Sequence, residues 1–196
     1  VDSNGNWSIT VSNAASSFGQ GAETLSVTQT DAAGNISAAG TREITIDTAL
    51  PDAPTISMVA GNDIVNASES SNLVISGTGE AGATVLLSNT SQTTVVDSNG
   101  NWSITVSDAA TSFGQGSEVL TVTQTDTAGN TSAATQKTIT VDTLIPAAPT
   151  ISTVTGDNFV NSSEVQNLVI SGTGEVGATV TLAVTNQTAV VDSNGN

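Results

Sequence analysis

The chain repeats itself at a constant interval. The hexapeptide VDSNGN begins at Val1, Val96 and Val191, so successive copies start 95 residues apart, and the sequence between them recurs with few changes. This period is longer than the roughly 20–50 residues of a solenoid repeat. It matches a self-contained β domain of roughly 100 residues. The sequence therefore predicts a tandem array of similar domains.

Apolar and polar residues alternate within the repeat. Trp102, Ile104 and Val106 alternate with serine and threonine, and Leu120 and Val122 alternate with Thr121 and Thr123. A period of two with β-branched residues indicates half-buried strands. We expect seven strands, at Thr55–Val59, Leu73–Ser76, Thr84–Ser88, Thr93–Val96, Trp102–Val106, Val119–Thr125 and Thr138–Val141, and one helical turn within Asp108–Gly116. Short strands separated by turn residues predict an all-β, antiparallel, immunoglobulin-like sandwich.

Two proline-containing segments separate the repeats. ITIDTALPDAPTI holds Pro51 and Pro54, and ITVDTLIPAAPTI holds Pro146 and Pro149. Proline fixes φ and lacks an N–H donor, so a strand should end before each pair and a new one should begin after it. These segments are short, stiff linkers rather than flexible tethers.

The linkers divide the chain into three parts. Residues 48–142 are predicted to form a complete immunoglobulin-like repeat. Residues 1–47 supply the last three strands of a preceding repeat, and residues 143–196 supply the first four strands of a following one. Neither partial repeat has enough strands to close a core alone. We expect the missing strands to come from a longer chain or from neighbouring copies, which would then associate head to tail.

Charge and missing residue types exclude several functions. Eighteen acidic residues are set against only Arg42 and Lys137, giving a net charge of −16. Nucleic acids and anionic membrane surfaces require clustered Lys and Arg, so neither is an expected partner. No apolar run approaches the ~20 residues of a membrane span. Cysteine and histidine are absent, which removes their nucleophilic chemistry and the usual zinc sites. The sequence does not indicate an enzyme.

Two motifs resemble ligand-binding loops but fit turns better. GTGEAG, at Gly77–Gly82, matches the dinucleotide fingerprint GxGxxG, which requires a helix to open at its last glycine. A strand-like sequence follows instead, so we interpret the motif as a tight turn. DSNGN, at Asp97–Asn101, resembles the start of an EF-hand loop, but Trp102 stands where that loop needs glycine. Its Asn-Gly pair is typical of a two-residue hairpin turn.

Acidic residues are predicted to gather where the chain enters a repeat. Alternating strand direction places the loops of Glu80, Asp97 and Asp126 at this pole, and the incoming linker adds Asp47 and Asp52. The matching residues elsewhere are Asp142, Glu175 and Asp192 at the next junction and Asp31 in the preceding repeat. Ca²⁺ takes about six to eight oxygen ligands, so it suits such a cluster. The alternative is that each carboxylate is simply solvated, as most loop acids are.

The order of these segments resembles the bacterial immunoglobulin-like repeats of giant surface adhesins, the Bap-like and RTX-type adhesins of Gram-negative bacteria. The resemblance covers the whole chain through DTxxPxAPTI, VNxSE, ISGTGExGATV, VDSNGNWSITV and VTQTDxAGNxS. It implies tandem extender domains, secretion to the cell surface by a type I system, and Ca²⁺ that stiffens the domain junctions.

The resemblance also implies a ligand set for each junction. Asp47, Glu80 and Asp126 should share one ion. Asp142 and Glu175 should share another with an aspartate beyond this chain, and Asp31 should belong to the junction before. Three acids rank second: Asp52 is replaced by Ala147 in the next linker, and the predicted turn already explains Asp97 and Asp192.

The expected function is that of an extracellular stalk supporting adhesion and biofilm formation, with neighbouring repeats of the same chain as partners. One alternative is a ligand-binding module. Its only aromatic candidate is Phe113, whose equivalent Phe18 favours a structural role instead. A second alternative is a self-associating matrix filament that pairs through threonine-rich edge strands.

Overall fold

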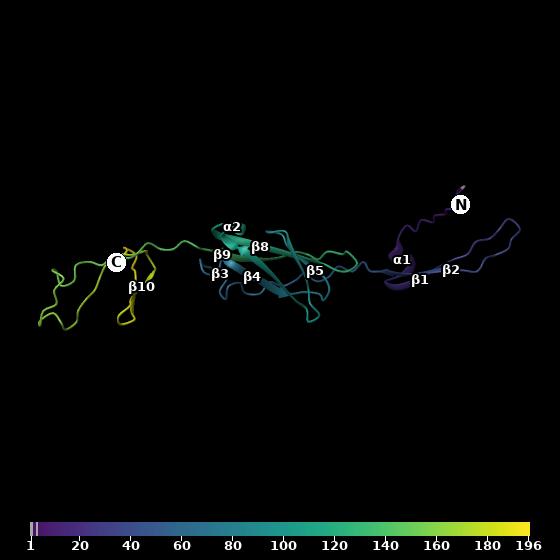
Figure 1. Cartoon of the computed structure of the whole chain (residues 1–196). Helices are drawn as coiled ribbons and strands as arrows, with labels where there is room; N and C mark the ends of the chain where they lie inside the picture. The colour runs from purple at the N-terminus through teal and green to yellow at the C-terminus, as the bar shows by residue number, and fades with distance from the viewer. Residues whose placement is uncertain (1, 3) are drawn as a thin grey trace. The chain divides into compact units, whose positions relative to one another are not determined.

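The computed structural model describes residue 2 and residues 4–196, and it divides the chain into two compact units, Val1–Thr143 and Leu144–Asn196 (Figure 1). The first unit contains α1 (Ala14–Phe18), β1 (Gly21–Val27), β2 (Gly40–Ile46), β3 (Ile64–Val65), β4 (Ser71–Thr78), β5 (Thr84–Leu87), β6 (Gln92–Val95), β7 (Asn101–Asp108), α2 (Ala109–Phe113), β8 (Gly116–Thr125) and β9 (Thr135–Val141). The second contains β10 (Thr179–Leu182) and β11 (Gln187–Val190). No helix of the described residues is long and apolar enough to cross a membrane.

Two sheets enclose the core of the first unit. One has five strands in the order β3-β9-β8-β5-β6, and the other pairs β4 with β7. Alternate residues of both sheets point inward, and the largest fully buried side chains include Ile75, Leu87, Leu120 and Ile139. The predicted all-β, immunoglobulin-like sandwich is confirmed. The expected helical turn is α2, and Phe113 at its end packs against the core.

One strand pair departs from the antiparallel expectation. β3 runs parallel to β9, and no separate strand was predicted at Ile64–Val65. Within the described chain, the predicted strand Thr55–Val59 is not a regular one, although the N–H groups of Thr55 and Ser57 donate to β4 carbonyls at 2.8 Å. The first strand is therefore split: residues 55–57 accompany one sheet, and β3 joins the other.

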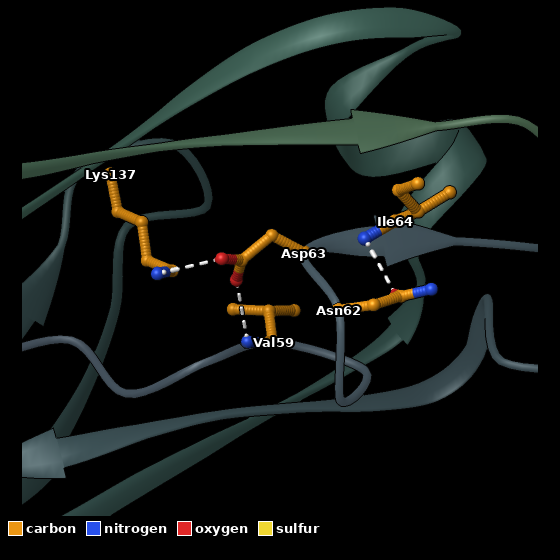
Figure 2. Close-up of polar contacts among 5 residues, drawn as sticks. All are labelled: Val59, Asn62, Asp63, Ile64 and Lys137. Atoms are coloured by element: carbon orange, nitrogen blue, oxygen red, sulfur yellow. Dashed lines mark hydrogen bonds and ion pairs between the residues drawn. The ribbon is translucent and has the colours of Figure 1, made fainter.

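Asp63 shapes the turn at which the chain changes sheets (Figure 2). Its carboxylate accepts the N–H of Val59 at 2.8 Å and lies 2.9 Å from Nζ of Lys137 on β9. The Val59 hydrogen bond, followed by Lys137, lowers the pKa of Asp63. At the equivalent position, Asn158 accepts the N–H of Val154 at 3.0 Å and shares the positive φ. The turn therefore requires the side-chain oxygen rather than the charge.

The Asn-Gly turn forms at the predicted place, but it does not join a hairpin. Gly100 has a φ of +82° and donates to the Asp97 carbonyl at 3.0 Å. β6 before the turn pairs with β5, whereas β7 after it pairs with β4 in the other sheet. The hairpin expectation was wrong because turn residues specify a chain reversal and not the strands that pair.

Several apolar residues outside residues 48–142 are exposed where their equivalents within that range are buried. β1 and β2 keep the register of β8 and β9, but residues 7–11, which the structure describes, form no strand. Trp7 is 58% exposed, whereas its equivalent Trp102 is 3% exposed. β10 and β11 likewise pair as β5 and β6 do, without a strand among the described residues 166–173. Each missing strand lacks its partner, since residues 7–11 correspond to β7 and residues 166–173 to β4.

Candidate functional site

Uncharged side chains attach the linker to the complete repeat. Gln124 on β8 is only 1% exposed, and its Nε2 donates to the Asp52 carbonyl at 2.7 Å. Its Oε1 accepts the N–H of Glu80 at 2.9 Å. The Thr135 hydroxyl donates to the Pro54 carbonyl. The linker is thereby joined to the loop after β4 and to the face of the five-stranded sheet.

The glycines of GTGEAG allow this close approach. A Cβ at Gly77 would lie 1.9 Å from the Thr55 carbonyl oxygen, and one at Gly79 would lie 2.4 Å from Oε1 of Gln124. Gly82, with a φ of +86°, completes the turn before β5. The interpretation of the motif as a tight turn is confirmed, since a strand follows it and not a helix.

Asp126 and Asn130 close the loop between β8 and β9. The Oδ1 of Asp126 accepts the N–H groups of Ala128 and Asn130 at 2.9 Å, and its Oδ2 accepts Nδ2 of Asn130 at 2.9 Å. The same Nδ2 donates to the carbonyl of Asp47 in the linker at 3.2 Å. The Asn130 side-chain bond is the main cause that lowers the pKa of Asp126, so this carboxylate is ionised at neutral pH.

A glutamine holds the first residues of each linker. Nε2 of Gln20 donates to the Thr48 hydroxyl at 2.6 Å, and the Thr48 N–H donates back to Oε1 at 3.0 Å. Gln115 and Thr143 repeat both bonds at 2.6 and 3.1 Å. Sequence reasoning missed these pairs and Asn130. The recurrence of SFGQG and of the DT dipeptide at the same 95-residue interval was the available signal.

The acids predicted to bind metal lie in loops that follow different strands. Asp47 follows β2, Glu80 follows β4, Asp126 follows β8 and Asp142 follows β9, all in the first unit, where Asp31 follows β1; Glu175 lies in the second unit. Asp126 and Asp47 are linked through Asn130, and Glu80 is linked to the linker through Gln124. Among residue 2 and residues 4–196, no group of three or more acidic side chains is close enough to hold a metal ion.

The second-ranked acids have local roles. Oδ1 of Asp97 accepts the N–H groups of Asn99 and Asn101 at 2.8 Å, and Asp192 repeats this arrangement. Asp52 contacts Gln124 through its carbonyl. The Asp47 carbonyl and the ionised Asp126 carboxylate nevertheless fit the chemistry of a hard cation, which binds oxygen ligands. The two oxygens lie close enough for the Asn130 amide to contact both. The shared-ion assignments stay predictions.

Fold and linker together define a tandem immunoglobulin-like repeat protein. Residues 51–142 match the family model of the bacterial Ig domain. The family is structural and not enzymatic. This match confirms the bacterial immunoglobulin-like repeat that the sequence predicts.

Two solved structures are similar to this chain. One is of a Ca²⁺-stabilized adhesin that helps an Antarctic bacterium reach out and bind ice; it is 33% identical, with a TM-score of 0.42, over 89% of this chain and 47% of that chain. The other concerns the host cell surface retention of a 1.5-MDa bacterial ice-binding adhesin; it is 34% identical, with a TM-score of 0.44, over 88% of this chain and 60% of that chain. This chain thus spans only part of both. No curated protein matches it.

Proposed function

We propose that this chain is an extender segment of a large bacterial cell-surface adhesin, lying outside the cell and supporting adhesion and biofilm formation. We assign residues 48–142 to one complete repeat and residues 1–47 and 143–196 to parts of its neighbours. The observation that carries the proposal is the linker, which is bonded on both sides: Gln20 of the preceding repeat holds Thr48, and Asn130 of the complete repeat holds Asp47. A spacer needs this defined connection and no unique pocket, which suits near-identical repeats.

Within this proposal, Ca²⁺ stiffens the junction. The net charge of −16 disfavours close approach of acidic segments, and a divalent cation offsets that repulsion. Asp126 offers an ionised carboxylate, Asp47 offers a carboxylate and a carbonyl, and Glu80 lies in the loop that Gln124 binds to the same linker. These residues would hold the ion, which supplies coordination between the two repeats. For the other junctions, Asp142, Glu175 and Asp31 stay the ligands that the sequence predicts.

Replacing Asp126 by asparagine tests the metal site. The new amide side chain would keep an oxygen for the N–H groups of Ala128 and Asn130 but lose the negative charge that binds a cation. At a Ca²⁺ concentration about 100 times the Kd, binding should stabilise the wild type by ~2.7 kcal/mol. The D126N variant should lose most of this gain in thermal unfolding, whereas the control E69Q, in a loop away from the linker, should keep it. Equal Ca²⁺ responses of D126N and E69Q would remove Asp126 from the site.

Where no flanking repeat supplies the missing strands, a second copy of the chain supplies them by head-to-tail pairing. The registers Leu73↔Val106 and Ile75↔Ile104 of the complete repeat define the pairing Leu168↔Val11 and Ile170↔Ile9 between two copies. Ile9 is 74% exposed, whereas its equivalent Ile104 is 5% exposed, so this pairing would bury a face that the partial repeat leaves open.

Sedimentation of the 196-residue chain over a range of concentrations tests the pairing. We expect reversible association that I9D weakens at least ~10-fold, because the new carboxylate would be buried without a partner. Ile36 provides the control: it is 70% exposed and its equivalent Thr131 remains exposed in the complete repeat, so I36D should associate as the wild type does. A monomeric wild type at every concentration would refute this partner assignment.

A further inference from the structure

The side-chain amide of Asn130 contacts two oxygens on different segments. Its Nδ2 donates to Oδ2 of Asp126 at 2.9 Å and to the carbonyl of Asp47 at 3.2 Å. An amide nitrogen carries two hydrogens, so one hydrogen serves each acceptor. Asp126 belongs to the complete repeat, whereas Asp47 directly follows β2 of the preceding one. A single side chain therefore connects two repeats.

The acceptor on the linker is itself anchored. Thr48, the residue after Asp47, is held by Gln20 through two hydrogen bonds at 2.6 and 3.0 Å. Gln20 lies between α1 and β1, so the peptide next to the Asp47 carbonyl is fixed to the preceding repeat. A continuous series of contacts therefore connects the preceding repeat to Asn130. It runs from Gln20 to Thr48, along the chain to Asp47, and from the Asp47 carbonyl to the Asn130 amide.

The preceding repeat supplies an internal comparison. Asn35 occupies the place of Asn130, and its Nδ2 donates to Oδ2 of Asp31 at 2.8 Å. The loop geometry is thus the same in both repeats. Asn35 is exposed, whereas Asn130 is half-buried where its amide reaches the linker. Both asparagines therefore close their loops, and Asn130 also contacts the linker.

We propose that Asn130 is a junction latch: a positioning residue that fixes the orientation of adjacent repeats without metal by bridging the Asp126 carboxylate and the Asp47 carbonyl. The part that concerns Ca²⁺ rests on the proposed function. The amide occupies the space between two oxygens that a cation would also use, so an ion shared by Asp126 and Asp47 replaces the latch and is not added to it. The latch then orients the two repeats before the ion binds.

Distance measurements between spin labels test the latch. The chain has no cysteine, so T41C on β2 and T138C on β9 provide two unique and exposed attachment sites. In excess chelator, the wild type should give a narrow distance distribution. N130A and N130D both remove the donor to the Asp47 carbonyl, and the loss of one hydrogen bond should lower the population of the latched orientation roughly fivefold. N35D, the same change in the loop that does not contact this linker, should leave the distribution narrow.

The same distance measurements in Ca²⁺ distinguish the latch from the proposed metal site. If Asp126 and Asp47 share the ion, N130D should regain a narrow distribution in Ca²⁺, because its new carboxylate adds a ligand, and it should do so at a lower Ca²⁺ concentration than N130A. If N130A is as narrow as the wild type in chelator, the latch is refuted whatever Ca²⁺ does. If N130A broadens in chelator and Ca²⁺ changes no variant, the latch stands and the metal assignment fails.

Discussion

The Gly77→Ala substitution should destabilise the complete repeat by ~3 kcal/mol or more. The added Cβ would lie 1.9 Å from the carbonyl oxygen of Thr55, 2.7 Å from its carbonyl carbon and 3.0 Å from Cε2 of Trp102. The first two are backbone atoms, so the clash is relieved only if residues 55–57 leave β4. Overpacking alone costs ~1–3 kcal/mol, and the hydrogen bonds from Thr55 and Ser57 would be lost in addition, at ~1 kcal/mol each.

Urea unfolding of the chain, followed by tryptophan fluorescence, measures this loss. Gly129→Ala is the matched control, because a Cβ there meets nothing within 4 Å and only the φ of +98° opposes it. That backbone strain should cost ~1–2 kcal/mol. If G77A loses no more stability than G129A, the linker does not depend on its contact with β4.

The Gln124→Ala substitution should have an effect of similar size. It removes the donor to the Asp52 carbonyl in the linker and the acceptor of the Glu80 N–H in the loop after β4. Both bonds are part-buried, so each backbone group left without a partner costs ~1–3 kcal/mol, and the vacated volume of Gln124 adds a cavity term. We expect a loss of ~3–4 kcal/mol in the free energy of unfolding.

Hydrogen exchange identifies the cause of that loss. The amide of Glu80 should exchange faster in Q124A, because its acceptor is gone. Gln136 on the neighbouring β9 is exposed and makes only a 3.4 Å contact with Thr121, so Q136A should change stability by less than ~0.5 kcal/mol. An unchanged Glu80 exchange rate in Q124A would contradict the role given to this side chain.

Sequence periodicity predicted which residues face the core better than which strands are neighbours. Alternation placed Leu120 and Val122 inward, and both are fully buried. It cannot show that β3 crosses to β9, because this depends on a turn at Asp63 that is stabilised by a side-chain oxygen and not by apolar spacing. For the same reason, the turn at Gly100 was found but its strands were assigned to one sheet.

The linker contacts were present in the sequence but were not recognised. Gln124 lies two residues after Val122 on the same inward face, and a polar residue at a buried position must have partners. The contact of Asn130 could not be predicted, since nothing in TDxAGN indicates that its amide reaches a segment 83 residues away. The acidic residues predict a site at this junction, whereas the contacts observed there are made largely by amides and hydroxyls.

Small-angle X-ray scattering and thermal unfolding of the 196-residue chain, first in millimolar Ca²⁺ and then in excess chelator, test the central claim most directly. A Ca²⁺-stiffened extender should show a larger maximum dimension and a higher Tm in Ca²⁺, and chelator should reverse both. Identical scattering curves and Tm values in the two conditions would contradict the account. The junction would then be held by the Gln20, Gln124 and Asn130 contacts alone.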